Sequence, residues 1–225
     1  MPGTAISLDA ALELTRTGDL WLFRGTSVAD RAIRATTNSP VNHVGMAVVL
    51  DDLPPLMWHA ELGRSLTDVW SGTRQRGVQL HDARAAVLQW TGRYGQRGWL
   101  RQLSPAVTRD MEDAVLRTVA RLDGTPFPST ARLAGRWLRG RLPLPATLGG
   151  LGHWHRPGDA PASGQALETA YCAEVVAVTY EAMGLLPGRR PHWYDPGRFW
   201  SGDDLRLAHG YRLGGEIGIE LPPAG

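Results

Sequence analysis

The 225-residue sequence contains no lysine, since all 24 of its basic residues are arginine. This absence excludes a lysine Schiff base and a phosphate-binding loop that depends on lysine. The single cysteine, Cys172, excludes an intramolecular disulfide and a cysteine-rich zinc site. No apolar run approaches the roughly 20 residues of a membrane span. The N-terminus lacks the basic and apolar regions of a signal peptide, so we expect a cytoplasmic protein.

The net charge of the chain is also small. A net charge of +2 argues against bulk electrostatic binding of nucleic acid. Hydrophobic residues make up 43% and charged residues 20%, which is ordinary globular composition. We therefore predict a single domain over residues 1–225, with an irregular insertion rich in Gly, Pro and Arg around 125–166.

Hydrophobic patterning predicts strands early in the chain, helices later and one late strand. This order is typical of an α+β domain with a mostly antiparallel sheet. The predicted strands are 19–23, 43–50, 56–62, 77–81, 85–90 and 216–221. The predicted helices begin at Leu8 with Ser7 as the cap, at Ser27, at Ser104-Pro105 and at Leu167, with a further possible helix at 129–139.

The sole cysteine lies in the first turn or two of the predicted 167–183 helix. Unpaired N–H groups and the positive dipole end there stabilise a thiolate. His43 begins the strongest predicted strand and is a candidate base, while His59 and Glu61 on the next strand point to one face. Strand parity does not choose between those two as the group that orients His43. Cys172 also belongs to an apolar helical stripe, and spacing alone favours a buried core cysteine.

Three segments together resemble a known family. They are Asn42-His43-Val44-Gly45-Met46, Trp58-His59-Ala60 and Tyr171-Cys172-Ala173-Glu174-Val175-Val176. They resemble the NlpC-type papain-fold cysteine enzymes. Because the cysteine follows the histidine, the order resembles the circularly permuted branch, which includes the YiiX-like proteins and the lecithin:retinol acyltransferase group.

The resemblance implies a permuted papain-like α+β fold and a cysteine hydrolase or acyltransferase that works through an acyl-enzyme. It assigns Cys172 as nucleophile, His43 as general base and His59 as the orienting residue. Glu61 is the alternate third residue, since the YiiX-like branch often has Glu where His59 stands. The implied substrate is an amide or ester, with a lipid or N-acyl compound favoured and no cofactor required. A cell-wall peptide substrate and a non-catalytic binding module are the alternatives.

Other features have weaker interpretations. His153 and His155 lie in a Gly/Pro-rich segment without a nearby carboxylate, so we expect a loop there rather than a metal site. Trp58, Tyr171 and Trp154 are candidates for a substrate pocket. Four residues of the 129–139 segment are candidates for peripheral membrane contact, although a solvated basic face is commoner: Arg132, Arg136, Trp137 and Arg139.

Overall fold

The computed structural model describes residues 5–25, 39–61, 63–126, 164–188, 194–202 and 205–221, with only the backbone described for 164–170. The predicted helices at 27–37 and 129–139 lie outside these residues. So do most of the 125–166 insertion and the predicted membrane-contact residues. Within the described part, no helix is long and apolar enough to cross a membrane.

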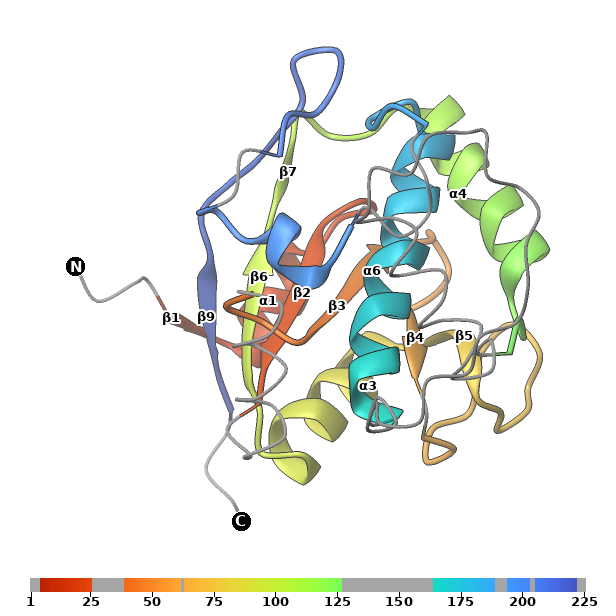
Figure 1. The fold of residues 1–225 in the computed structure, drawn as a ribbon, viewed down its shortest axis with the longest axis vertical. Coiled ribbons are helices and arrows are strands. Elements are labelled where there is room, and N and C mark those ends of the chain that lie inside the picture. The colour runs from red at the N-terminus through yellow and green to blue at the C-terminus, as the bar shows by residue number, and fades with distance from the viewer. Residues whose placement is uncertain are drawn as a thin grey trace, which may run out of the picture.

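A seven-stranded sheet forms the centre of the fold, with the order β1-β9-β6-β2-β3-β4-β5 (Figure 1). Its neighbours pair antiparallel except for β1 and β9, which run parallel. The mostly antiparallel α+β class is therefore confirmed. The strands are β1 (Ala5–Ser7), β2 (Leu20–Arg24), β3 (His43–Val48), β4 (Leu56–Glu61), β5 (Gly77–Asp82), β6 (Arg97–Arg101) and β9 (Ile217–Glu220). A separate two-stranded sheet pairs β7 (Leu103–Ser104) with β8 (Arg212–Leu213).

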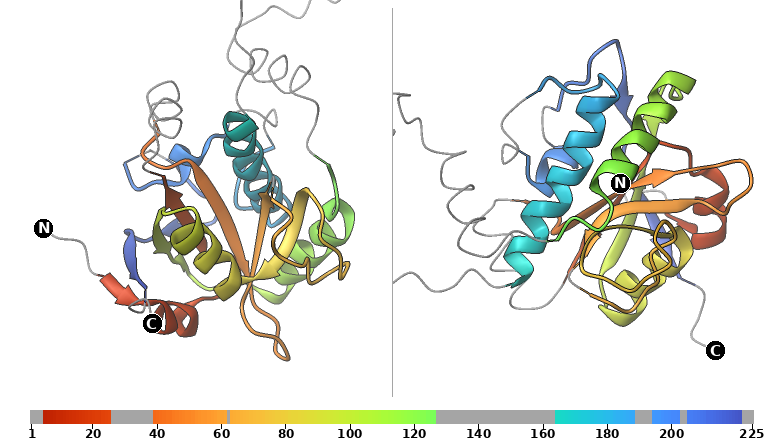
Figure 2. Two further views of the ribbon diagram at one scale, coloured as in Figure 1. Left: turned by 90° about the horizontal axis from the view of Figure 1, so that it is seen from below. Right: turned by 90° about the vertical axis from the view of Figure 1, so that its right-hand side faces the viewer.

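Helices cover both faces of the sheet. On one face, α6 (Gly164–Ala182) lies across β3 and β4, with α4 (Arg109–Leu122) beside it. On the other face lie α1 (Leu8–Leu14) and α3 (Ala83–Leu88), as the right view of Figure 2 shows. A short 3₁₀ turn at Pro196–Phe199 also contacts α6.

The strand residues alternate between two cores, which we name after these helices. The α6-side core contains Val44 and Met46 of β3, Trp58 and Ala60 of β4, and Cys172 of α6. The α3-side core contains four aromatic and aliphatic residues that matter below: Phe23, Ala47, Met57 and Trp90. Because successive side chains point to opposite faces, His43 shares the face of Ala47, and His59 and Glu61 share the face of Met57. All three of these polar residues therefore point away from α6.

Two predicted elements are wrong. Residues 85–90 do not form a strand, because Asp82 caps a helix there by accepting a hydrogen bond from Ala85 N at 2.8 Å. A π-helical turn, Gln89–Arg93, follows. The helix predicted from Ser104 begins at Arg109 instead, with Thr108 as its cap. Ser104 is part of β7, where it pairs with Arg212.

Candidate functional site

Three buried histidines from adjacent strands form a continuous hydrogen-bonded chain. His43 Nε2 lies 3.0 Å from His59 Nδ1, and His59 Nε2 lies 2.9 Å from His81 Nδ1. His81 Nε2 in turn lies 3.1 Å from Gln79 Oε1. The chain therefore crosses β3, β4 and β5 on the α3-side face, and each of its side chains is essentially unexposed.

The contact between His43 and His59 runs diagonally between strands β3 and β4, with Gly45 beside it. The register pairs Met46 with Trp58, so its continuation places Gly45 opposite His59. A Cβ at Gly45 would lie 2.8 Å from Met57 Cγ and 3.4 Å from His59 Cβ. Glycine at position 45 thus leaves room for the Met57 side chain.

Trp90 fixes the His43 ring from the other side. The two rings are stacked, with centroids 3.7 Å apart and planes inclined by 13°. Phe23, the partner of His43 on β2, adds a tilted ring contact at 5.8 Å. The imidazole is therefore held in one orientation by packing as well as by its hydrogen bond.

The hydrogen-bonded chain also defines the tautomer of each ring. Gln79 Nε2 lies 3.5 Å from the Gly77 carbonyl, so Gln79 presents its oxygen to His81. His81 must then donate from Nε2, which leaves its Nδ1 to accept from His59 Nε2. By the same logic His43 donates from Nε2 to His59 Nδ1. A lone pair is left on His43 Nδ1, a buried atom without a hydrogen-bond partner among the described residues.

Burial keeps the three imidazoles neutral at pH 7. Desolvation lowers the pKa of His43 to about 3 and, against the opposing charge of Asp68, that of His81 to about 4. The pKa of His59 is also well below its usual value, first because of burial and then because of its two histidine neighbours. The neutral state agrees with the tautomers derived above.

Glu61 lies at the end of β4, next to this chain but not in contact with His43. Its Oε1 accepts a hydrogen bond from Tyr94 Oη at 3.1 Å, and its Oε2 lies 3.7 Å from His81 Nδ1. Burial raises the pKa of this carboxyl group, while the Tyr94 hydrogen bond partly opposes the shift. Of the two candidates for the third residue, His59 is therefore the one that contacts His43.

Cys172 lies elsewhere in the molecule. Its side chain is fully buried in the α6-side core, whereas the histidine rings pack against Trp90 on the other face of the sheet. Helix α6 begins at Gly164, so Cys172 lies more than two turns inside it rather than in its first turn. The predicted support from unpaired N–H groups at the helix start is therefore absent at this position. The structure brings His43 and His59 together but does not place Cys172 on their face.

The predicted pocket residues have separate locations. Trp58 is fully buried against α6, and its Nε1 donates a hydrogen bond to Thr179 Oγ1 at 3.1 Å. Trp58 therefore lies in the helix–sheet core, on the face of the sheet opposite His59. Tyr171 is 7% exposed and also packs in the α6-side core. Trp154, His153 and His155 lie outside the described residues.

Sequence reasoning missed His81, Gln79, Trp90 and Tyr94. Gln79 and His81 stand two apart in a predicted strand, so parity alone gives them one face. Which face, and beside which strand, depends on the pairing of β5 with β4. The contact of Trp90 with His43 was not predicted, because residues 85–90 were predicted as a strand.

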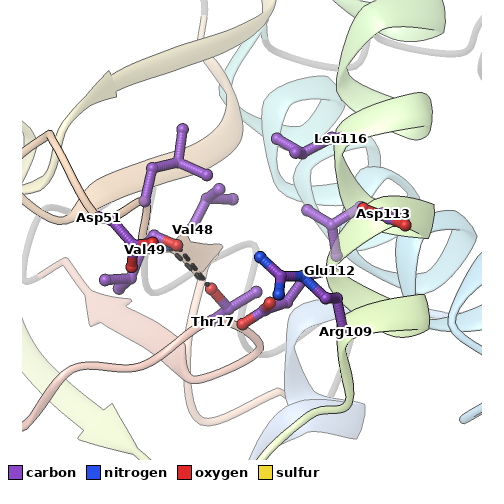
Figure 3. Close-up of a pocket in the computed structure, with 10 residues that line it drawn as sticks. Thr17, Val48, Val49, Asp51, Arg109, Glu112, Asp113 and Leu116 are labelled. Atoms are coloured by element: carbon purple, nitrogen blue, oxygen red, sulfur yellow. Dashed lines mark hydrogen bonds between the residues drawn. The ribbon is translucent and has the colours of Figure 1, made fainter.

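A small open pocket lies at the other end of β3, far along the strand from His43 (Figure 3). It has a volume of about 160 Å³ and lies between the β3–β4 turn and the start of α4. Arg109, Glu112 and Asp113 line its helical side, and Thr17 lies opposite them with a hydrogen bond to the Val49 carbonyl at 3.2 Å. The pocket contains no histidine or cysteine, and we assign it no chemistry.

Comparison with solved structures shows likenesses to known proteins. The crystal structure of metalloprotein YiiX from Escherichia coli O157:H7 is similar over 78% of this chain and 68% of that chain, with 17% sequence identity and a TM-score of 0.46. No family model matches the sequence. No curated protein matches it either.

Proposed function

We propose that this chain is a cysteine-dependent hydrolase or acyltransferase with a permuted papain-like fold. It would act on an amide or ester through an acyl-enzyme. The observation that carries the proposal is His43, whose Nδ1 lone pair has no described partner while its Nε2 is held by His59. A base needs this arrangement, because one nitrogen must accept the proton and the other must be fixed.

The chain behind His43 supports the role of a base. When Nδ1 takes a proton, His43 still donates from Nε2 to the lone pair of His59 Nδ1, whereas burial opposes the positive charge and lowers the pKa of His43. His59 is itself oriented by His81 and Gln79. His59 thus acts as the orienting residue, whereas Glu61 contacts Tyr94 rather than His43.

The nucleophile in this proposal is Cys172. Helix α6 packs on β3 and β4, the strands that carry His43 and His59. For proton transfer, Cys172 Sγ has to come within hydrogen-bond distance of His43 Nδ1. The proposal therefore requires the segment that carries Cys172 to shift relative to β3 when substrate binds. A lipid or N-acyl compound remains the favoured substrate, and a cell-wall peptide is the second choice.

The test is intact-mass analysis of the full chain after incubation with a panel of aryl esters and N-acyl amides of graded chain length. We expect an acyl adduct that maps to Cys172, that is absent in Cys172→Ala and that forms more slowly in His43→Gln. Exposed His209→Asn is the matched histidine control, and we expect it to behave as the wild type. Turnover by Cys172→Ala at the wild-type rate would overturn the proposal.

A second candidate is a non-catalytic binding module with the same fold. The observation that favours it is the burial of Cys172 in the α6-side core. Alkylation by iodoacetamide at pH 7 separates the two. A thiol that His43 activates reacts in the folded protein, whereas a core thiol reacts only after denaturation.

A further inference from the structure

We propose that His59, Glu61 and His81 form a binding site for one divalent transition-metal ion of the zinc class. One ligand atom from each of these residues lies within 4.8 Å of the other two, and all three side chains are buried. Imidazole nitrogen and carboxylate oxygen are ligands that zinc accepts. The sequence did not predict this site, because its three residues come from two strands and only their pairing brings them together.

The distances fit a tetrahedral ion. His59 Nε2 lies 2.9 Å from His81 Nδ1, which lies 3.7 Å from Glu61 Oε2. Zinc–ligand bonds of about 2.0–2.2 Å at tetrahedral angles place ligand atoms roughly 3.4 Å apart. The observed distances bracket this value, so only small movements of the side chains are needed. Three protein ligands leave a fourth position for water.

Hydrogen bonds to neighbouring residues also support the metal site, because each of the three ligands has an outer hydrogen-bond partner. His81 Nε2 contacts Gln79 Oε1, His59 Nδ1 contacts His43 Nε2, and Glu61 Oε1 accepts from Tyr94 Oη. Metal-binding histidines and carboxylates are commonly oriented by such contacts, whose loss weakens binding about 10–100-fold. In each side chain, one polar atom is therefore available to bind the ion, and the other polar atom contacts a neighbouring residue.

The site lies close to the surface at its Glu61 end. Tyr94, which bonds Glu61, is 41% exposed. Gly63 covers the carboxylate so closely that a Cβ there would clash with Glu61 Oε1 and lie 3.1 Å from Tyr94 Oη. Glycine at position 63 therefore lets the backbone pack directly over the Glu61 carboxylate.

Metal binding would change the tautomers without changing the number of bound protons. The ion takes the lone pair of His59 Nε2, so that ring carries its proton on Nδ1 and donates it to His43 Nε2. His43 then carries its own proton on Nδ1. The loaded site and a basic His43 Nδ1 are therefore alternatives, which makes the metal proposal separable from the proposed hydrolase.

The test uses the full chain, stripped with a chelator and titrated with Co²⁺ and then with Zn²⁺ against a chromophoric chelator. We expect one equivalent of Co²⁺ with the intense visible bands of tetrahedral coordination, displaced by Zn²⁺. Glu61→Gln and His81→Gln each should weaken Zn²⁺ binding at least 100-fold. The controls Glu220→Gln and His209→Asn, both exposed, should bind as the wild type.

Tyr94→Phe keeps the test valid if a buried variant does not fold. This change at a partly exposed ring should weaken Zn²⁺ binding about tenfold. Cys172→Ala separates the two proposals, because it removes the nucleophile while it keeps all three metal ligands and their outer hydrogen-bond partners. Octahedral Co²⁺ in the wild type, or unchanged Zn²⁺ affinity in both Glu61→Gln and His81→Gln, would overturn the inference.

Discussion

Asp19 couples the stability of the protein to pH at the scale of a single residue. Its buried carboxylate accepts hydrogen bonds from Leu103 N at 2.8 Å and Arg16 N at 2.9 Å. Burial nevertheless raises its pKa from 3.8 to about 6. The native state therefore binds this proton more tightly than the unfolded chain does. The resulting stabilisation is complete below about pH 4 and is lost as the pH rises through 6.

Asp19→Asn should remove this pH dependence. In the wild type, ionisation of Asp19 lowers the free energy of unfolding by up to about 3 kcal/mol as the pH rises from 4 to 7. Denaturant unfolding at several pH values should show a smaller fall in the variant. Asp52→Asn, at an exposed loop position, is the control and should keep the wild-type slope. An unchanged slope in Asp19→Asn would contradict the prediction.

His59 and Glu61 make different contacts, and the difference predicts their effects on turnover. His59→Ala removes the group that contacts His43 at 3.0 Å and should lower acyl-transfer turnover by about 10²–10⁴-fold. Glu61→Ala should cost much less, because Glu61 contacts Tyr94 and His81 instead. Both variants are assayed on one substrate at saturating concentration. Full turnover in His59→Ala would mean that it does not orient His43.

At the scale of secondary-structure elements, a side-chain hydrogen bond between Trp58 and Thr179 links α6 to the sheet. Trp58 Nε1 of β4 donates to Thr179 Oγ1, which donates in turn to the Val175 carbonyl within the helix. Thr179→Val keeps the shape of the side chain but leaves the buried indole N–H without an acceptor. The free energy of unfolding should fall by about 1–3 kcal/mol.

Thr179→Ser is the matched control, because it keeps the hydroxyl and loses only a methyl group. Its cost should be about 1 kcal/mol or less. Denaturant unfolding monitored by tryptophan fluorescence measures both variants. A Thr179→Val protein as stable as Thr179→Ser would show that the indole hydrogen bond contributes nothing to the docking of α6.

The element boundaries show where local sequence was misleading. A short apolar run such as 85–90 fits either a helix or a strand, and the helix cap at Asp82 was the signal that separates them. Strand β6 was missed because Arg97, Gly98 and Arg101 hide its alternation. Arg101 is nevertheless buried, and its guanidinium donates to the carbonyls of Phe199 and Gly214. Those partners are more than 90 residues away, so no local pattern reveals them.

At the scale of the whole molecule, the last strand closes one side of the sheet. β9 lies between β1 and β6, and Ile217 and Ile219 pack against the α3-side core. Deletion of residues 216–225 should cost about 3 kcal/mol, which corresponds to a fall in Tm of about 6–12 °C. Deletion of 222–225 alone is the control and should leave Tm unchanged.

The histidine cluster should survive this deletion. β2 and β6 separate β9 from β3, β4 and β5, so the NMR signals of the three histidine rings are expected to stay in place. Loss of those signals at a temperature where the truncated chain is still folded would mean that the two halves of the sheet are not independent.

Local sequence was enough to predict the α+β class, five strands (β2, β3, β4, β5 and β9), helices α1 and α6 near their predicted positions, and the contact between His43 and His59. These features follow from apolar periodicity and from short motifs, which are local. Tertiary structure decided the rest, because strand pairing is not local. It placed His59 rather than Glu61 in contact with His43, and it added His81, Gln79 and Trp90 from other elements. It also placed Cys172 and the histidines on opposite faces of the sheet. Helix α6 packs against the face that carries Val44, whereas His43, one residue earlier on β3, points to the other face.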